Sequence, residues 1–199
     1  LAYQAAGIQK GDVVIVPTNT FSATANAAVF CGADIEFCDV DPQSGNLTPQ
    51  TVDEALSRLK KAGRKPKAIT AVHFGGAPVD LVGISELAKK HSAFLFEDAA
   101  HALGASDLSG SRIGSCKFSL ASTFSFHPIK TITTAEGGAV TTSDPQLQKR
   151  ILKLRSHGMT KDPAEWEDPP KESDPLYYEI HAIGSNYRLP DILCALGRN

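Results

Sequence analysis

The fold of this chain is decided by residues 68–98, which read AITAVHFGGAPVDLVGISELAKKHSAFLFED. The apolar run Ala68–Phe74 predicts a buried strand, and the turn signal Gly75–Pro78 closes it. Ile84–His91 has the apolar spacing of a helix, and Ala93–Phe96 is again a short apolar strand. A strand, a helix and a second strand in this order predict two parallel strands joined by a crossover helix.

The same alternation continues on both sides of this unit. Further strands are predicted at Asp12–Val16, Ile35–Val40, Ser122–Phe126 and Ala139–Thr142. Further helices are predicted at Ala23–Phe30, at a segment that Thr48 caps and Pro49 opens, and at Pro145–His157. The two ends, Leu1–Ile8 and Asp191–Gly197, have the pattern of helices that are cut short. The sequence therefore predicts an α/β fold with a mainly parallel sheet flanked by helices.

Composition narrows the range of functions. The 199 residues are 42% hydrophobic and 21% charged, with a formal net charge of -2, which is typical of a globular domain. The scattered basic residues give no reason to expect nucleic acid or a membrane surface as a partner. No apolar run reaches the roughly 18 residues of a membrane span, and no signal peptide is recognisable. The four cysteines have no metal-ligand spacing, so we expect reduced thiols in the cytoplasm.

The order of the elements also predicts where a ligand binds. In sheets of this kind, ligands lie beyond the carboxyl ends of the strands. Three segments follow such ends, namely Pro17–Phe21, Phe74–Gly76 and Asp98–Gly104. By contrast, Lys161–Pro175 carries four prolines and many charges, and we expect it to be an exposed excursion.

One lysine stands out near the end of a predicted strand. Residues 123–138 read TFSFHPIKTITTAEGG, so Lys130 lies among hydroxyl residues between an apolar strand and a Gly-Gly pair. Lysine is rarely buried without a function, and a desolvated amine is a nucleophile that can form a Schiff base. The pattern alone leaves a second interpretation open, in which Lys130 is an ordinary lysine in an exposed loop.

A carboxylate and an imidazole follow the strand at Phe94. Asp98 ends the apolar run, and His101 comes three residues later. An aspartate in this place could pair with a cationic nitrogen of a bound cofactor. Two simpler interpretations remain open: Asp98 could cap a following helix, and His101 could be a hydrogen-bonded core histidine.

Taken together, these stretches resemble the DegT/DnrJ/EryC1/StrS family of sugar aminotransferases. Other stretches with the same resemblance, in the same order, are Val14–Asn26, Val40–Pro42, Val72–Gly76 and Gly184–Leu189. The resemblance implies the large domain of a fold-type-I transferase that depends on pyridoxal 5'-phosphate (PLP). It also implies that residues 1–199 are part of that domain, without the family's phosphate-binding segment upstream and its small domain downstream.

The resemblance assigns roles residue by residue. Lys130 corresponds to the catalytic lysine that forms the Schiff base with the cofactor, and Asp98 to the carboxylate that keeps the pyridine nitrogen protonated. His101 corresponds to a polar position beside the ring, and Phe21 to the aromatic residue that stacks on it. Ser125 corresponds to a hydroxyl on the phosphate, and Asn186 to an asparagine that crosses the interface of a homodimer to the partner's phosphate.

Two further stretches indicate a branch of the family. Arg155–Asp162 and Tyr177–Glu179 look most like the branch that makes the pseudaminic acid precursor. Its members transfer an amino group from glutamate to a 4-keto nucleotide sugar. Related sugar dehydratases carry His where this chain has Lys130, and a non-catalytic PLP-binding regulator would leave Lys130, Asp98 and His101 unexplained. The sequence lacks the glycine motif of nicotinamide dehydrogenases and the nucleophile motif of serine hydrolases.

Overall fold

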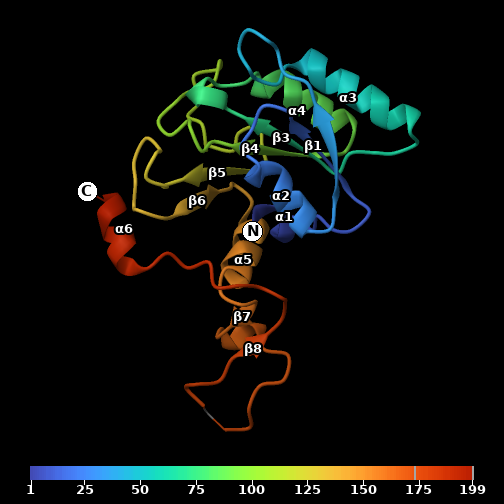
Figure 1. Cartoon of the computed structure of the whole chain (residues 1–199). Coiled ribbons are helices and arrows are strands. Elements are labelled where there is room, and N and C mark those ends of the chain that lie inside the picture. The colour runs from blue at the N-terminus through green and yellow to red at the C-terminus, as the bar shows by residue number, and fades with distance from the viewer. Residues whose placement is uncertain (173, 199) are drawn as a thin grey trace.

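A six-stranded sheet forms the centre of the molecule in the computed structural model, which describes residues 1–172 and 174–198 (Figure 1). The strand order is β2-β1-β3-β4-β5-β6. The bounds are β1 Val13–Pro17, β2 Asp34–Cys38, β3 Ala68–Val72, β4 Phe94–Asp98, β5 Ala121–Ser125 and β6 Gly138–Thr141. The first five run parallel, and β6 pairs antiparallel with β5. The expected mainly parallel α/β fold is confirmed.

Helices cover both faces of the sheet and create two apolar cores. One core joins β1 and β3 to α3 (Pro49–Lys61) and α4 (Leu81–Lys90). The other lies on the opposite face, where α1 (Ala2–Ala5), α2 (Ala23–Phe30) and α5 (Pro145–Leu154) pack. Every residue of β1 and of β3 is buried, as expected for central strands between two helical layers.

Local signals in the sequence explain where the helices begin. The hydroxyl of Thr48 accepts a hydrogen bond from the backbone N–H of Thr51, and Pro49 opens α3, as predicted. The Asp80 carboxylate accepts from the N–H of Gly83, so α4 begins at Leu81, three residues before the predicted start. At the other end of the chain, α5 stops at Leu154 rather than His157.

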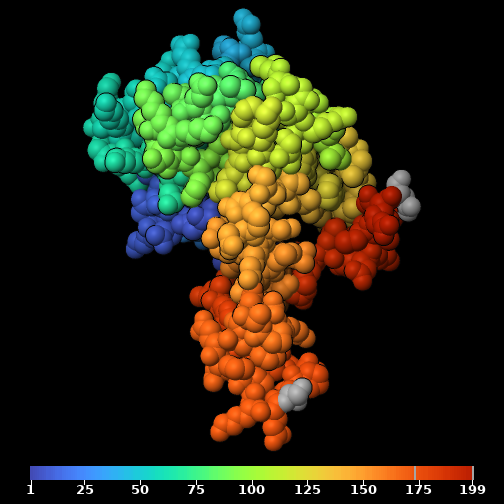
Figure 2. Space-filling view, turned by 180° about the vertical axis from the view of Figure 1, so that it is seen from behind, coloured from blue at the N-terminus to red at the C-terminus, as the bar shows by residue number. Residues whose placement is uncertain are grey.

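Residues 156–172 and 174–187 form a projection that we call the arm. Figures 1 and 2 show it extending from α5 away from the sheet. It contains the short strands β7 (Met159–Thr160) and β8 (Glu179–Ile180), and a 3-10 turn, η2, at Pro163–Glu165. The predicted exposed excursion lies within it. After the arm the chain ends in α6 (Asp191–Arg198), which none of the other described elements buries.

An acidic residue attaches the arm to α5. Glu165 forms ion pairs with Lys149 and Lys153, and it accepts a hydrogen bond from the Thr160 hydroxyl. These hydrogen bonds lower the pKa of the Glu165 carboxyl to about 2, so it stays ionised at neutral pH.

Within the described residues, no helix has the length and apolar character needed to cross a membrane.

Candidate active site

A cavity of about 410 Å³ opens at the carboxyl ends of the parallel strands. It lies beside β1, where the strand order reverses. In the sheet, β2 lies on one side of β1, and β3, β4 and β5 lie on the other side. Its walls contain five of the six residues proposed from the sequence, namely Phe21, Asp98, His101, Ser125 and Lys130. All three segments predicted from the strand ends contribute to this cavity, and ligand binding in it stays a prediction.

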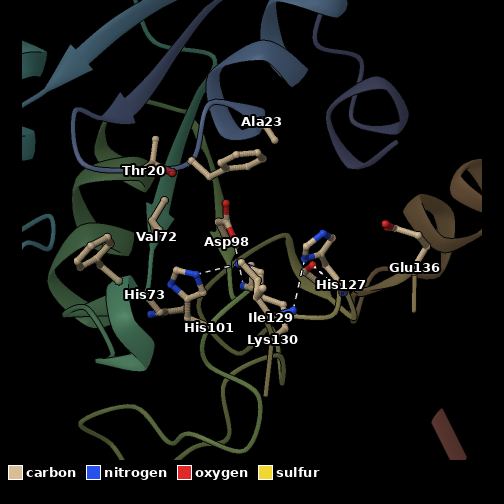
Figure 3. A pocket seen from close by; sticks show the side chains of 15 residues that line it. Thr20, Ala23, Val72, His73, Asp98, His101, His127, Ile129, Lys130 and Glu136 are labelled. Carbon is tan, nitrogen blue, oxygen red and sulfur yellow. Dashed lines mark hydrogen bonds between the residues drawn. The ribbon is translucent and has the colours of Figure 1, made fainter. Parts of the chain in front are cut away.

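Lys130 turns into this cavity rather than into solvent. It lies in the loop between β5 and β6, and its Nζ is 2.9 Å from Nε2 of His101 (Figure 3). The other ring nitrogen of His101, Nδ1, accepts a hydrogen bond of 3.3 Å from the N–H of Gly75. An ordinary exposed loop lysine would not line a cavity at the strand ends. Lys130 is half-buried as a residue, and its amine is held by a residue from the neighbouring strand end.

The glycines beside His101 are required by close contact. Gly75 has φ of +60°, a conformation that residues with a side chain rarely adopt. A Cβ on Gly76 would come within 2.8 Å of the carbonyl oxygen of His101. Backbone atoms cannot yield as a flexible side chain can. The Gly75-Gly76 turn therefore allows the loop after β3 to support the imidazole.

Asp98 ends β4 and points toward the cavity. Its Oδ2 accepts a hydrogen bond of 2.7 Å from the Thr24 hydroxyl, and its Oδ1 accepts one of 3.2 Å from the N–H of Ala100. No helix follows β4, because the chain enters a turn at Ala100. The interpretation of Asp98 as a helix cap is therefore wrong. His101 is exposed, so the core-histidine interpretation is wrong as well.

Phe21 and Ser125 complete the predicted set inside the cavity. The ring of Phe21 is 76% exposed at the cavity wall, so one face is free to cover a flat ligand. The Ser125 hydroxyl lies at the end of β5 and accepts a hydrogen bond of 3.3 Å from the N–H of His127. Its own proton remains free to donate to a ligand.

Asn186 lies outside this cavity. It is an exposed residue of the arm, where it forms an isolated bridge with Ser156. Its side-chain oxygen accepts a hydrogen bond of 3.3 Å from the N–H of Arg188. A single chain therefore does not bring Asn186 to its own Lys130, and its assignment to a partner's site stays a prediction.

Sequence reasoning missed a buried polar pair under the cavity. His73 is fully buried, lines the cavity, and places Nε2 3.0 Å from Oε2 of Glu97. The N–H of Val79 donates to Nδ1 of His73 over 3.2 Å, so Nε2 carries the proton that Glu97 accepts. Glu97 also accepts from the Ser119 hydroxyl. The sequence held one signal for this pair. His73 lies near the end of one predicted apolar strand, and Glu97 directly follows the next.

The arrangement can bind a flat anionic or carbonyl-bearing molecule. It offers an amine nucleophile, an ionisable carboxylate, an imidazole and an aromatic face around one cavity. In the described ranges, no group of three or more His, Cys, Asp or Glu side chains is placed to hold a metal ion. Covalent chemistry at the Lys130 amine is the reaction type that these residues favour.

Curated proteins with similar sequences point the same way. The chain is 43% identical over 199 residues to the UDP-4-amino-4,6-dideoxy-N-acetyl-beta-L-altrosamine transaminase of Campylobacter jejuni subsp. jejuni serotype O:23/36 (strain 81-176). The match covers 100% of this chain and 48% of that protein. The chain thus spans about half the length of the curated relatives it matches.

Solved structures agree with the sequence matches. An aminotransferase from Psychrobacter cryohalolentis matches with a TM-score of 0.84 and 36% identity, over 99% of this chain and 47% of that one. Helicobacter pylori PseC, an aminotransferase of pseudoaminic acid biosynthesis, matches with a TM-score of 0.80 and 34% identity, over 99% and 49%. NtdA from Bacillus subtilis, solved with bound cofactor PMP, has a TM-score of 0.78 and 26% identity, over 98% and 40%.

A model of one protein family matches the whole chain. The match covers residues 1–199, and its description is the DegT/DnrJ/EryC1/StrS aminotransferase family. The sequence resemblance, the parallel sheet and the relatives above all agree with this match. The chain belongs to the DegT/DnrJ/EryC1/StrS aminotransferase family.

Proposed function

We propose that this chain is the PLP-binding large domain of an aminotransferase that moves an amino group from glutamate to a 4-keto nucleotide sugar. The observation that carries the proposal is the convergence of Lys130, His101 and Asp98 on one cavity, with Nζ of Lys130 2.9 Å from the imidazole. Family membership supports the reaction class. We also propose that the protein acts in the cytoplasm as a homodimer.

The residues in the cavity fit PLP. Phe21 offers an exposed aromatic face, His101 lies at the cavity wall, and Asp98 can accept a hydrogen bond from a cationic ring nitrogen. The Ser125 hydroxyl is free to donate to a phosphate oxygen. A solved relative with bound PMP, NtdA, supports this choice of cofactor.

Each residue has a distinct task in the proposed reaction. When bound, PLP supplies an electron sink for the carbon next to nitrogen. Asp98 holds the ring nitrogen through a charge-assisted hydrogen bond. Lys130 attaches the cofactor through its amine and, when released, moves a proton to and from the reacting carbon. The pair of His73 and Glu97 keeps the floor below them in place.

The substrate class rests on the relatives. A Campylobacter transaminase acting on a UDP-linked N-acetylated sugar is 43% identical, and PseC has the same fold over 99% of the chain. We infer that the amino acceptor is a UDP-linked 4-keto-6-deoxy-N-acetyl sugar. A pseudaminic acid type of surface-glycan precursor would be the product.

Borohydride labelling tests the assignment of Lys130. The natural protein with PLP should absorb visible light, and reduction should fix the cofactor on the peptide that contains Lys130. The Lys130→Ala variant should lose transamination and the covalent label, because no other amine faces Asp98 and His101 in the cavity formed by the described residues. A label on a different lysine would contradict the assignment.

A comparison of acceptors tests the substrate class. With glutamate as donor, the UDP-linked N-acetylated 4-keto sugar should be turned over faster than a dTDP-linked 4-keto-6-deoxy sugar without the N-acetyl group. Removing the nucleotide should lower kcat as well as raise KM, because remote binding energy is used to orient the reacting carbon. A clear preference for the dTDP sugar would overturn the substrate class and leave the aminotransferase proposal standing.

A further inference from the structure

We propose that Thr24 is a positioning residue for Asp98, and that a relay of two threonine hydroxyls aims this carboxylate at the cofactor. The proposal rests on the function proposed above and adds residues that none of the site assignments include. Thr24 lies in the first turn of α2, and its side chain is 6% exposed. Its hydroxyl is 2.7 Å from Oδ2 of Asp98, across 74 positions of sequence.

The direction of each hydrogen bond in the relay follows from the number of protons available. An ionised carboxylate only accepts, so the single proton of Thr24 goes to Asp98. The Thr24 oxygen can then only accept from Thr20, whose hydroxyl lies 2.7 Å away. Thr20 itself lines the cavity of about 410 Å³ that Lys130 lines, which is called the large cavity below. The relay therefore runs from the cavity wall through Thr24 to the back of Asp98.

Thr24 approaches Asp98 from the side opposite to the proposed cofactor. A second cavity of about 180 Å³ is lined by Thr24, Tyr3 and Thr70, and Asp98 borders both cavities. Thr24 does not line the large cavity, so it acts on a ligand there through its hydrogen-bond partners, of which Asp98 is the charged one. Figure 3 shows the Asp98 carboxylate between the first turn of α2, marked by Ala23, and the side of the cavity that holds Lys130.

The other polar groups behind Asp98 do not replace Thr24. Burial raises the pKa of the Tyr3 hydroxyl, and the negative charge of Asp98 adds to this effect, so Tyr3 stays a neutral phenol. Tyr3 is paired with the Thr70 hydroxyl instead of with Asp98. Within residues 1–172 and 174–198, Thr24 is the one side chain that donates to the carboxylate.

The two donors together fix the orientation of the carboxylate. Thr24 occupies a lone pair of Oδ2, and the N–H of Ala100 occupies a lone pair of Oδ1. A carboxylate has about four lone-pair sites, so acceptor capacity remains for a cationic N–H in the large cavity. Without one of the two donors, the orientation of the carboxylate is no longer fixed. Its hydrogen bond to the cofactor nitrogen then becomes weaker. Thr24 thereby controls how well Asp98 serves the cofactor.

Substitution of Thr24 tests the proposal in the natural protein with PLP. Thr24→Val keeps the branched shape and removes the hydroxyl, and we expect it to lower cofactor affinity and kcat about tenfold, as for loss of a hydrogen bond to a charged group. The Thr24→Ser variant keeps the hydroxyl, so its cofactor affinity and kcat should stay close to those of the unmodified protein. The NMR signal of the isotope-labelled ring nitrogen of PLP should move toward the unprotonated form in Thr24→Val only.

Thr70→Val is the matched control. Thr70 is as buried as Thr24 and lines the same small cavity, but it bonds to Tyr3 and not to Asp98. Its loss should lower the melting temperature without moving the ring-nitrogen signal. If Thr70→Val moved that signal as far as Thr24→Val, the effect would be general loosening of the fold and the proposal would be wrong.

A double-mutant cycle with Asp98→Asn separates the two proposals. Because Thr24 acts through Asp98, Thr24→Val should change cofactor affinity less than about twofold in the Asp98→Asn background. An undiminished effect there would overturn the role of Thr24 while the aminotransferase proposal stands. If the unmodified protein took up no PLP, the proposed function would fail first, and the role of Thr24 with it.

Discussion

Ala135 has a backbone conformation that an L-residue adopts only at a cost. Its φ is +67°, in the left-handed region, and it lies in the loop that carries Lys130. The loop is held on either side of it, since the Thr134 hydroxyl donates to the carbonyl of Glu136 and the N–H of Ala135 donates to the Thr133 hydroxyl. Tight packing at Thr134, which is 1% exposed, maintains the strained residue.

Ala135→Gly should therefore stabilise the protein. A left-handed conformation costs an L-residue about 1–2 kcal/mol. Glycine avoids this but loses about 0.5–1 kcal/mol to its freedom in the unfolded chain. The expected net gain is about 0.5–1 kcal/mol in the free energy of unfolding, measured by denaturant or thermal melting. Ala139→Gly in β6 is the control and should destabilise, because that strand position has no strain to relieve. Equal destabilisation by both changes would contradict the interpretation.

At the scale of single residues, the sequence predicted five residues that line the cavity but not the groups that hold them. Lys130, Asp98 and His101 were found because each lies in a recognisable stretch after a strand. Thr24 was missed as a partner of Asp98, because a hydrogen bond across 74 positions leaves no local pattern.

At the scale of elements, the sequence predicted every strand of the sheet, with errors at the ends. The run Ala68–Phe74 continues past β3, which ends at Val72. The chain turns there because the Asn46 side chain accepts the N–H of Phe74, a long-range contact that hydrophobic spacing cannot reveal. Similarly, α4 begins at Leu81, directly after its cap Asp80, and not at Ile84, where apolar spacing placed its start.

The direction of β6 was also beyond the sequence pattern. Apolar spacing gives the same prediction for parallel and antiparallel strands. In the structure, the connection from β5 contains the Lys130 loop and no helix, so β6 returns antiparallel beside β5. This hairpin fixes both ends of the loop, since Ser125 pairs with Gly138. A local pairing thus supports the catalytic lysine that we propose.

At the scale of the whole molecule, the contacts within one chain do not explain the exposed apolar surface of the arm. It exposes large apolar side chains, including Leu176 at 77%, Ile180 at 62% and Ile183 at 91%. Exposed apolar patches are typical of surfaces that pack against another chain or domain. Asn186 lies on the same projection, bridges to Ser156 of the arm, and does not line its own chain's cavity. These observations support the proposed homodimer, in which Asn186 serves the partner's site.

Complementation between two inactive variants tests that arrangement. A Lys130→Ala protomer keeps an intact Asn186, and an Asn186→Ala protomer keeps an intact Lys130. If Asn186 crosses to the partner, a mixed dimer has one complete site, which combines the intact Lys130 of one protomer with the intact Asn186 of the other. Random assortment into two-fold dimers should then restore up to about a quarter of the sites, measured as transaminase activity after subunit exchange. Exchange is checked independently with differently tagged protomers. If mixed dimers form and activity does not return, Asn186 does not complete the partner's site.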